Sequence, residues 1–133
     1  MPAHYGSTIL VIEDQRAMRY LLQTHLGRHF EVVACRDGLE AFAWMAAGHI
    51  PALIVLDLSM PRLDGFAFLT QLRASGWYRD VPVIVVSADA EDLSERQRRQ
   101  WHIQAVLTKP FDPQTLQQTV QQVLASTVAR ATH

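Results

Sequence analysis

The chain has 133 residues, 49% of them hydrophobic and 19% charged, and its 12 Lys and Arg against 13 Asp and Glu give a formal net charge of −1. This length fits one domain, and the composition is too apolar for a disordered chain. The near balance of charge argues against nucleic-acid binding through a basic excess.

The single cysteine and the short apolar runs exclude further classes of protein. Cys35 alone excludes an intrachain disulfide and a zinc site built from cysteines. The longest strongly apolar run, residues 51–56, falls far short of the roughly 20 residues that a bilayer requires. Residues 1–7 have neither the basic nor the apolar region of a signal peptide, so we expect a disordered or extended leader, a cytoplasmic location and no membrane contact.

The first part of the chain alternates apolar runs with helical spacing. Residues 8–12 are almost entirely apolar and predict a strand covered on both faces. Residues 31–35 predict a second strand, followed by a short helix over 39–47 that Gly48 closes. Between these strands, an amphipathic stripe predicts a helix ending at Gly27, with Met18, Leu21, Leu22, His25 and Leu26 facing inward.

The middle of the chain repeats this alternation. Residues 52–56 predict a third buried strand and residues 83–86 a fourth. Asp64 resembles an N-cap, and Phe66, Leu69 and Leu72 are expected to face inward on the helix that follows.

The last part predicts two helices around one strand. Residues 91–101 have few apolar positions, with acidic residues early and basic residues late, and predict an exposed helix. Residues 105–108 predict a fifth strand. Asp112 and Pro113 suit the N-cap and first position of a final helix, whose stripe is Leu116, Val120, Val123 and Leu124. Residues 127–133 have no pattern and are expected to fray.

Five successive strand–helix units predict an α/β domain over residues 8–126. Such alternation favours a parallel sheet with helices on both faces, joined by right-handed crossovers. We predict neither a linker nor a second domain.

Charged and hydroxyl side chains stand where the strands are predicted to end. Glu13 and Asp14 follow the first strand, Asp57 the third, Ser87 the fourth and Lys109 the fifth. Functional residues of parallel sheets lie beyond the carboxyl ends of the strands, so these groups are expected to meet at one edge.

This set of groups suits phosphoryl acceptance. Neighbouring carboxylates repel each other unless a cation intervenes, and Mg²⁺ prefers oxygen ligands. A carboxylate beside Mg²⁺, with an ammonium and a hydroxyl group near, is able to accept a phosphoryl group. Asp57 would then be the nucleophile and form an acyl phosphate.

Each of these residues also has an ordinary structural interpretation. Asp57 alone is more often a turn or cap residue than a nucleophile. Asp14 is a candidate N-cap of the first helix, Ser87 a cap, and Lys109 a solvated charge. Their occurrence at four of the five predicted strand ends favours a site more than any one residue does.

Four motifs together resemble the receiver domain of bacterial two-component response regulators, of the stand-alone chemotaxis-regulator type. The resemblance covers residues 8–126, and its motifs lie at 10–14, 56–65, 85–88 and 107–111. It implies a flavodoxin-like, doubly wound sheet of five parallel strands in the order 2-1-3-4-5, with five helices.

The resemblance also implies a role for each site residue. Asp57 matches the phosphoacceptor, and Ser87 and Lys109 match the groups that contact the phosphoryl group. Mg²⁺, or Mn²⁺ in its place, would be held by Asp14, Asp57, the backbone carbonyl of Ser59 and, through water, Glu13. The resemblance further suggests a cis bond before Pro110 and assigns a small residue, Ala88, beside the site.

Two positions depart from the family pattern. Val106 stands where the family usually has a Tyr or Phe that switches rotamer, and His102-Ile103 replaces a usual Gly-Ala pair. A valine has no ring to move between exposed and buried states. We hypothesise that Trp101 or His102 takes over this role.

The predicted function is phosphorelay signalling by a single receiver domain, rather than enzymatic turnover. A histidine kinase or phosphotransfer protein would phosphorylate Asp57, with Mg²⁺-dependent self-phosphorylation and dephosphorylation as side chemistry. Output would reach a protein target through the face formed by residues 91–101, 105–108 and the final helix, without nucleic acid, from a monomer or weak dimer. A degenerate receiver that binds partners without phosphorylation is the alternative, while a phosphohydrolase is disfavoured because Asp57-Leu58-Ser59 lacks a second acid.

Overall fold

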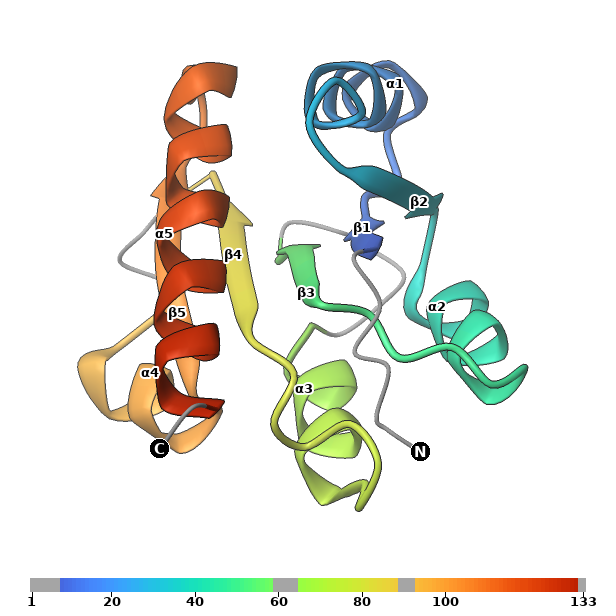
Figure 1. Cartoon of the computed structure of the whole chain (residues 1–133), viewed down its shortest axis with the longest axis vertical. Helices are drawn as coiled ribbons and strands as arrows, with labels where there is room; N and C mark the ends of the chain where they lie inside the picture. The colour runs from blue at the N-terminus through green and yellow to red at the C-terminus, as the bar shows by residue number, and fades with distance from the viewer. Residues whose placement is uncertain (1–7, 59–64, 89–92, 132–133) are drawn as a thin grey trace.

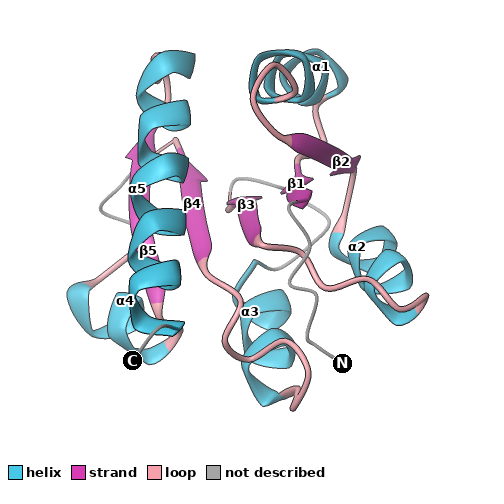
Figure 2. Cartoon of the chain, viewed as in Figure 1, coloured by secondary structure: helices cyan, strands magenta, loops and turns pink. Residues whose placement is uncertain are grey.

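In the computed structural model, residues 8–58, 65–88 and 93–131 are described, and within them strands and helices alternate (Figures 1 and 2). In chain order the elements are β1 (Thr8–Ile12), α1 (Arg16–Leu26), β2 (Glu31–Cys35), α2 (Gly38–Ala46), β3 (Leu53–Asp57), α3 (Gly65–Ala74), β4 (Val83–Ser87), α4 (Glu95–Gln100), β5 (Ile103–Thr108) and α5 (Pro113–Ala131).

The five strands form one parallel sheet in the order β2-β1-β3-β4-β5. The predicted doubly wound, flavodoxin-like fold is therefore confirmed. Because every strand runs in the same direction, the carboxyl ends of all five lie along one edge of the sheet.

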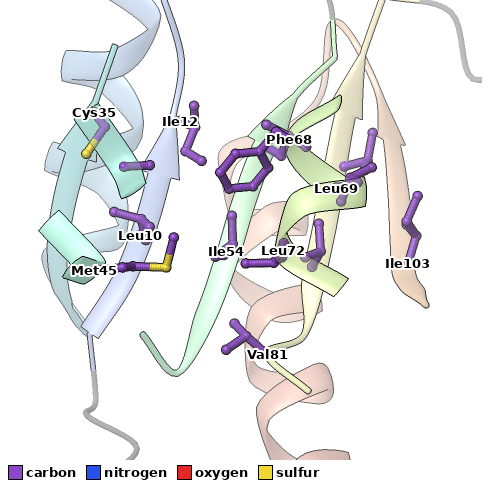
Figure 3. Packing of buried hydrophobic residues seen from close by; sticks show 14 of the residues in the cluster. Leu10, Ile12, Cys35, Met45, Ile54, Phe68, Leu69, Leu72, Val81 and Ile103 are labelled. Carbon is purple, nitrogen blue, oxygen red and sulfur yellow. The ribbon is translucent and has the colours of Figure 1, made fainter. Parts of the chain in front are cut away.

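Side chains alternate between two apolar layers, one on each face of the sheet. On one face, α2 and α3 contribute Met45, Phe68, Leu69 and Leu72, which pack with Leu10, Ile12, Ile54 and Leu56 (Figure 3). On the other, α1 and α5 contribute Leu22, Leu26, Leu116, Val120 and Val123, which pack with Ile9, Val11, Leu53 and Val55. The three central strands β1, β3 and β4 are consequently buried along their whole length, which explains their continuous apolar runs, whereas the edge strands β2 and β5 are only partly buried.

Helices α1 and α3 differ in detail from the predicted stripes. Leu22 and Leu26 of α1 are buried as expected, but Leu21 is 44% exposed. In α3, Leu69 and Leu72 are buried, whereas Phe66 is only half-buried and Phe68 fills the core in its place.

The region around α4 is shorter in helix and longer in strand than predicted. α4 begins at Glu95 because the Ser94 side chain accepts a hydrogen bond from the Gln97 N–H, while the Gln97 side chain accepts one from the Ser94 N–H. None of its residues is buried, as its composition predicted. β5 then begins at Ile103, directly after His102, whose φ of 52° turns the backbone sharply.

At the far end, α5 starts as predicted, with the Asp112 side chain accepting a hydrogen bond from the Gln114 N–H. The helix continues to Ala131 and so includes most of residues 127–133, the segment that was expected to fray. No helix within the described ranges is both long and apolar enough to cross a membrane.

One arginine ties the opposite, amino-terminal edge of the sheet together. The Arg73 guanidinium, from α3, donates hydrogen bonds to four backbone carbonyls. Two precede β4, Arg79 at 2.8 Å and Val81 at 2.7 Å, and two precede β5, Trp101 at 2.7 Å and His102 at 3.3 Å.

Candidate functional site

Backbone hydrogen bonds carry the sheet beyond its regular strands at the edge where the polar residues gather. The Glu13 N–H donates to the Cys35 carbonyl at 2.9 Å, across β1 and β2. The Lys109 N–H donates to the Ser87 carbonyl at 2.7 Å, across β4 and β5. These bonds fix the backbone of both charged residues against the neighbouring strand.

Three carboxylates meet at this edge, as predicted. One oxygen from each of Glu13, Asp14 and Asp57 lies within 4.8 Å of the other two. Glu13 is 1% exposed and Asp57 3% exposed. The interpretation of Asp14 as a helix cap does not hold, because the N-cap of α1 is Gln15.

Lys109 bridges two of these acids. Its Nζ lies 2.9 Å from Asp57 Oδ2 and 3.4 Å from Glu13 Oε1, and the lysine side chain is 18% exposed. The alternative of a solvated lysine is thereby excluded. The ammonium group instead contacts two of the three clustered carboxylates.

Crowding changes the proton affinity of these groups. Burial, reinforced by Asp57, raises the pKa of Glu13 from 4.5 to about 7, although the Gln15 N–H and the Lys109 charge oppose the shift. Burial by itself would lower the pKa of Lys109, but Asp57 and Glu13 outweigh it and raise that pKa above its ordinary value.

The donor set fits a hard divalent cation. Three carboxylates within a few ångströms offer oxygen ligands of the kind that Mg²⁺, Mn²⁺ and Ca²⁺ prefer. Two of the acids are buried, and burying like charges together is costly unless a cation offsets them. Lys109 supplies one positive charge, so a divalent ion would complete the neutralisation.

The remaining predicted residues have different outcomes. Ser87 is 1% exposed and ends β4, paired with Thr108, the last residue of β5, which directly precedes Lys109. The Lys109–Pro110 peptide bond is cis, as expected. Ser59, the predicted carbonyl ligand, and Asp64, the predicted cap, lie outside the described residues.

Arg19 was missed in the sequence, whereas Gly65 was included in the 56–65 motif without a structural role. Arg19, on α1, donates hydrogen bonds from Nη1 to the Glu13 carbonyl at 3.0 Å and the Asp14 carbonyl at 3.2 Å. Gly65 starts α3, and a Cβ there would overlap Leu58 Cδ2, so a larger residue would require the Leu58 side chain to move. No sequence signal marks Arg19, because its partners are backbone carbonyls.

Comparisons with known proteins agree with this geometry. A family model described as response regulator receiver domain matches residues 9–121. The chain is 32% identical over 120 residues to Response regulator Rre1 of Synechocystis sp., covering 89% of this chain and 52% of that protein. It is 26% identical over 120 residues to a Chemotaxis protein CheY homolog of Campylobacter jejuni, covering 89% and 92%. The chain spans about half the length of the first curated relatives it matches.

Solved structures show the same architecture. The chemotaxis response regulator CheY4 of Vibrio cholerae superposes with a TM-score of 0.77 at 26% identity, covering 88% of this chain and 98% of that one. A sensor protein from Polaromonas sp. superposes with a TM-score of 0.82 at 26% identity, covering 90% and 96%.

Proposed function

The chain belongs to the response regulator receiver domain family, and from this premise we propose that it accepts a phosphoryl group on Asp57 from a histidine kinase or phosphotransfer protein. The observation that carries the proposal is the contact of Lys109 Nζ with Asp57 Oδ2, inside a cluster of three carboxylates. A cap or turn residue requires neither a buried ammonium partner nor two neighbouring acids.

In the proposed reaction, the Asp57 carboxylate attacks the phosphorus of a phosphohistidine. The new O–P bond forms as the N–P bond breaks, and the departing imidazole nitrogen takes up a proton. Asp14, Asp57 and the Ser59 carbonyl would hold Mg²⁺ directly and Glu13 would do so through water. When bound, the metal would offset charge on the transferred oxygens.

Lys109 and Ser87 supply the remaining contacts in this proposal. Lys109 already lies at hydrogen-bond distance from the acceptor carboxylate, so its ammonium is placed to pair with an incoming phosphoryl oxygen. Ser87 ends the adjacent strand, and we assign its hydroxyl to the same oxygens. Attack of water on the acyl phosphate would later release inorganic phosphate and restore the Asp57 carboxylate.

We assign output to the face formed by α4, β5 and α5. α4 and the start of β5 border an open groove of about 560 Å³, lined by Glu95, Arg98, Arg99, His102, Ile103 and Gln104. The two arginines would complement an acidic segment on a target protein. Reversing their charge, as R98E and R99E, is expected to abolish binding of the target protein while leaving phosphorylation of Asp57 intact.

The same proposal places the chain in the cytoplasm, as a monomer or weak dimer.

Intact-mass measurement after incubation with Mg²⁺ and acetyl phosphate tests the phosphoacceptor role. The expected result is one phosphoryl adduct, absent without Mg²⁺ and absent in Asp57→Asn. If no adduct forms with either acetyl phosphate or a purified cognate kinase, although Mg²⁺ binds, the proposal is wrong. The chain would then be a receiver that binds partners without phosphorylation, an alternative that Val106 in place of an aromatic residue favours.

A further inference from the structure

Residues 13–15 form the acidic loop between β1 and α1. Among the described arginines, Arg19 is the one whose side chain hydrogen-bonds to this loop. Its Nη1 donates to the carbonyl oxygens of both Glu13 and Asp14, at 3.0 and 3.2 Å. These two residues carry two of the three clustered carboxylates. One guanidinium nitrogen therefore holds the backbone of both acids from the side of α1.

The loop is fixed from two other directions as well. The Glu13 N–H donates to the Cys35 carbonyl, which ties the loop to β2. The Gln15 N–H donates to Glu13 Oε2 at 3.1 Å, which orients that carboxylate. Arg19 completes the set because it alone binds the carbonyl of Asp14 as well as that of Glu13. The N-cap residue of α1, Gln15, makes no side-chain hydrogen bond to the helix, so it does not help to fix the loop in this way.

We propose that Arg19 is a positioning residue for the divalent cation, acting by aligning the Glu13–Asp14 backbone so that both carboxylates face Asp57. This inference rests on the proposed function, because the cation is the one that phosphorylation would use. Residues that orient metal ligands contribute heavily, and their loss typically costs about 10–100-fold in metal affinity.

Charge and geometry act in opposite directions here, which makes the role testable. A positive side chain near a cation site repels the cation, so removing the charge of Arg19 would by itself tighten binding. Losing the two hydrogen bonds would free the loop and weaken binding. The sign of the change in affinity therefore separates positioning from simple electrostatics.

The experiment is calorimetric titration of the full chain with MgCl₂ alone, with Arg19→Met, Arg19→Lys and a control, Arg16→Met. Arg16 lies on the same helix and is exposed, and its side chain makes no hydrogen bond or ion pair with another described residue. We expect Arg19→Met to raise the Kd for Mg²⁺ by about 10-fold or more. Arg19→Lys should recover part of that loss, and Arg16→Met should bind as tightly as wild type or tighter.

A second readout separates positioning from general damage. Acetyl-phosphate labelling of Arg19→Met should approach the wild-type rate once Mg²⁺ is raised to saturation, and chemical unfolding in EDTA should show that the variant is folded. An unchanged or lower Kd in Arg19→Met would overturn the role of Arg19 and leave the proposed function standing. A wild-type chain that gives no binding heat and is also not labelled by acetyl phosphate in the presence of Mg²⁺ would overturn both.

Discussion

The ring of Trp101, which ends α4, lies 5.0 Å from the ring of Phe66 in the first turn of α3, at an interplanar angle of 35°. The Trp101 carbonyl also accepts the 2.7 Å hydrogen bond from Arg73. Trp101 thus joins α3 to the α4–β5 turn through both its side chain and its backbone. This contact gives a physical route for the hypothesis that Trp101 replaces the missing aromatic at position 106.

A Trp44→Phe, Trp77→Phe double variant, in which Trp101 is the remaining tryptophan, tests that hypothesis. Adding Mg²⁺ and beryllofluoride, a mimic of the phosphoryl group, is expected to change the Trp101 emission, because the Phe66 contact would rearrange. The Asp57→Asn version of the same variant should show no change. If Trp101 emission stays constant although intact mass shows that acetyl phosphate phosphorylates the same variant, Trp101 does not act as the switch.

The buried Glu13 makes stability of the metal-free protein depend on pH. Its pKa is about 7 in the folded chain against an ordinary 4.5, so the native state binds the extra proton between these values. Stability from this group is full below pH 4.5 and falls as pH rises through 7. The loss amounts to about 3 kcal/mol.

Glu13→Gln removes that ionisation. In EDTA, we expect the variant to lose less stability than wild type between pH 5 and 8, measured by urea unfolding at each pH. Glu31→Gln, at an exposed position, should retain the wild-type profile. Parallel profiles for wild type and Glu13→Gln would contradict the prediction.

Cys35 is expected to resist alkylation in the native state. The side chain is 2% exposed, and burial, with the charges of Glu40 and Asp37, raises the pKa of its thiol to about 11. The thiolate is the reactive form, so iodoacetamide at pH 8 should label the folded chain at least about 100-fold more slowly than the chain in guanidinium chloride. Rapid labelling of folded protein, followed by mass spectrometry, would show that the thiol is accessible.

Arg73 is expected to be a major contributor to stability. Burial lowers the pKa of its guanidinium, against an opposing effect of Asp80, yet four carbonyl bonds compensate for its desolvation. Arg73→Met would leave those carbonyls without their donor and should cost about 2–4 kcal/mol in urea unfolding. The exposed Arg96→Met is the matched control and should change stability by less than about 0.5 kcal/mol. If both substitutions lowered the free energy of unfolding equally, the hydrogen bonds of Arg73 would contribute little to stability.

Gly48 and Gly76 offer a paired test of backbone strain. A Cβ at either position would meet no atom within 4 Å, but Gly48 has a φ of +109°. Gly48→Ala should therefore destabilise the fold by about 1–2 kcal/mol, while Gly76→Ala should be neutral or slightly stabilising. A Gly48→Ala variant as stable as wild type would mean that the α2–β3 loop readjusts without cost.

The sheet and its polar edge were predictable because their signals are local. A strand covered on both faces requires an uninterrupted apolar run, and residues 8–12 and 83–86 provide one within one residue of the observed bounds. An acid or lysine that ends such a run has few structural reasons to be there. The parallel strand direction puts Glu13, Asp57 and Lys109 at one edge of the sheet, and the strand order brings them into contact.

The remaining features depend on contacts that periodicity does not encode. Leu21 lies at the margin of the α1 stripe, so spacing alone could not exclude it from the core. The start of α4 is set by the reciprocal Ser94–Gln97 bonds rather than by the acidic residues before it. Arg19 and Arg73 act on backbone carbonyls, and a carbonyl leaves no mark in the sequence.

The hydrogen bonds of Arg73 also determine which loops of this molecule would tolerate an insertion. The connections into β4 and β5 are held by one guanidinium, so lengthening either would pull at least one carbonyl out of its reach. The α2–β3 connection around Gly48 and His49 is exposed and lies outside that network. An epitope or fluorescent reporter inserted there would meet the general condition for tolerated insertions, an exposed loop with few constraints, and would leave the phosphoacceptor edge untouched.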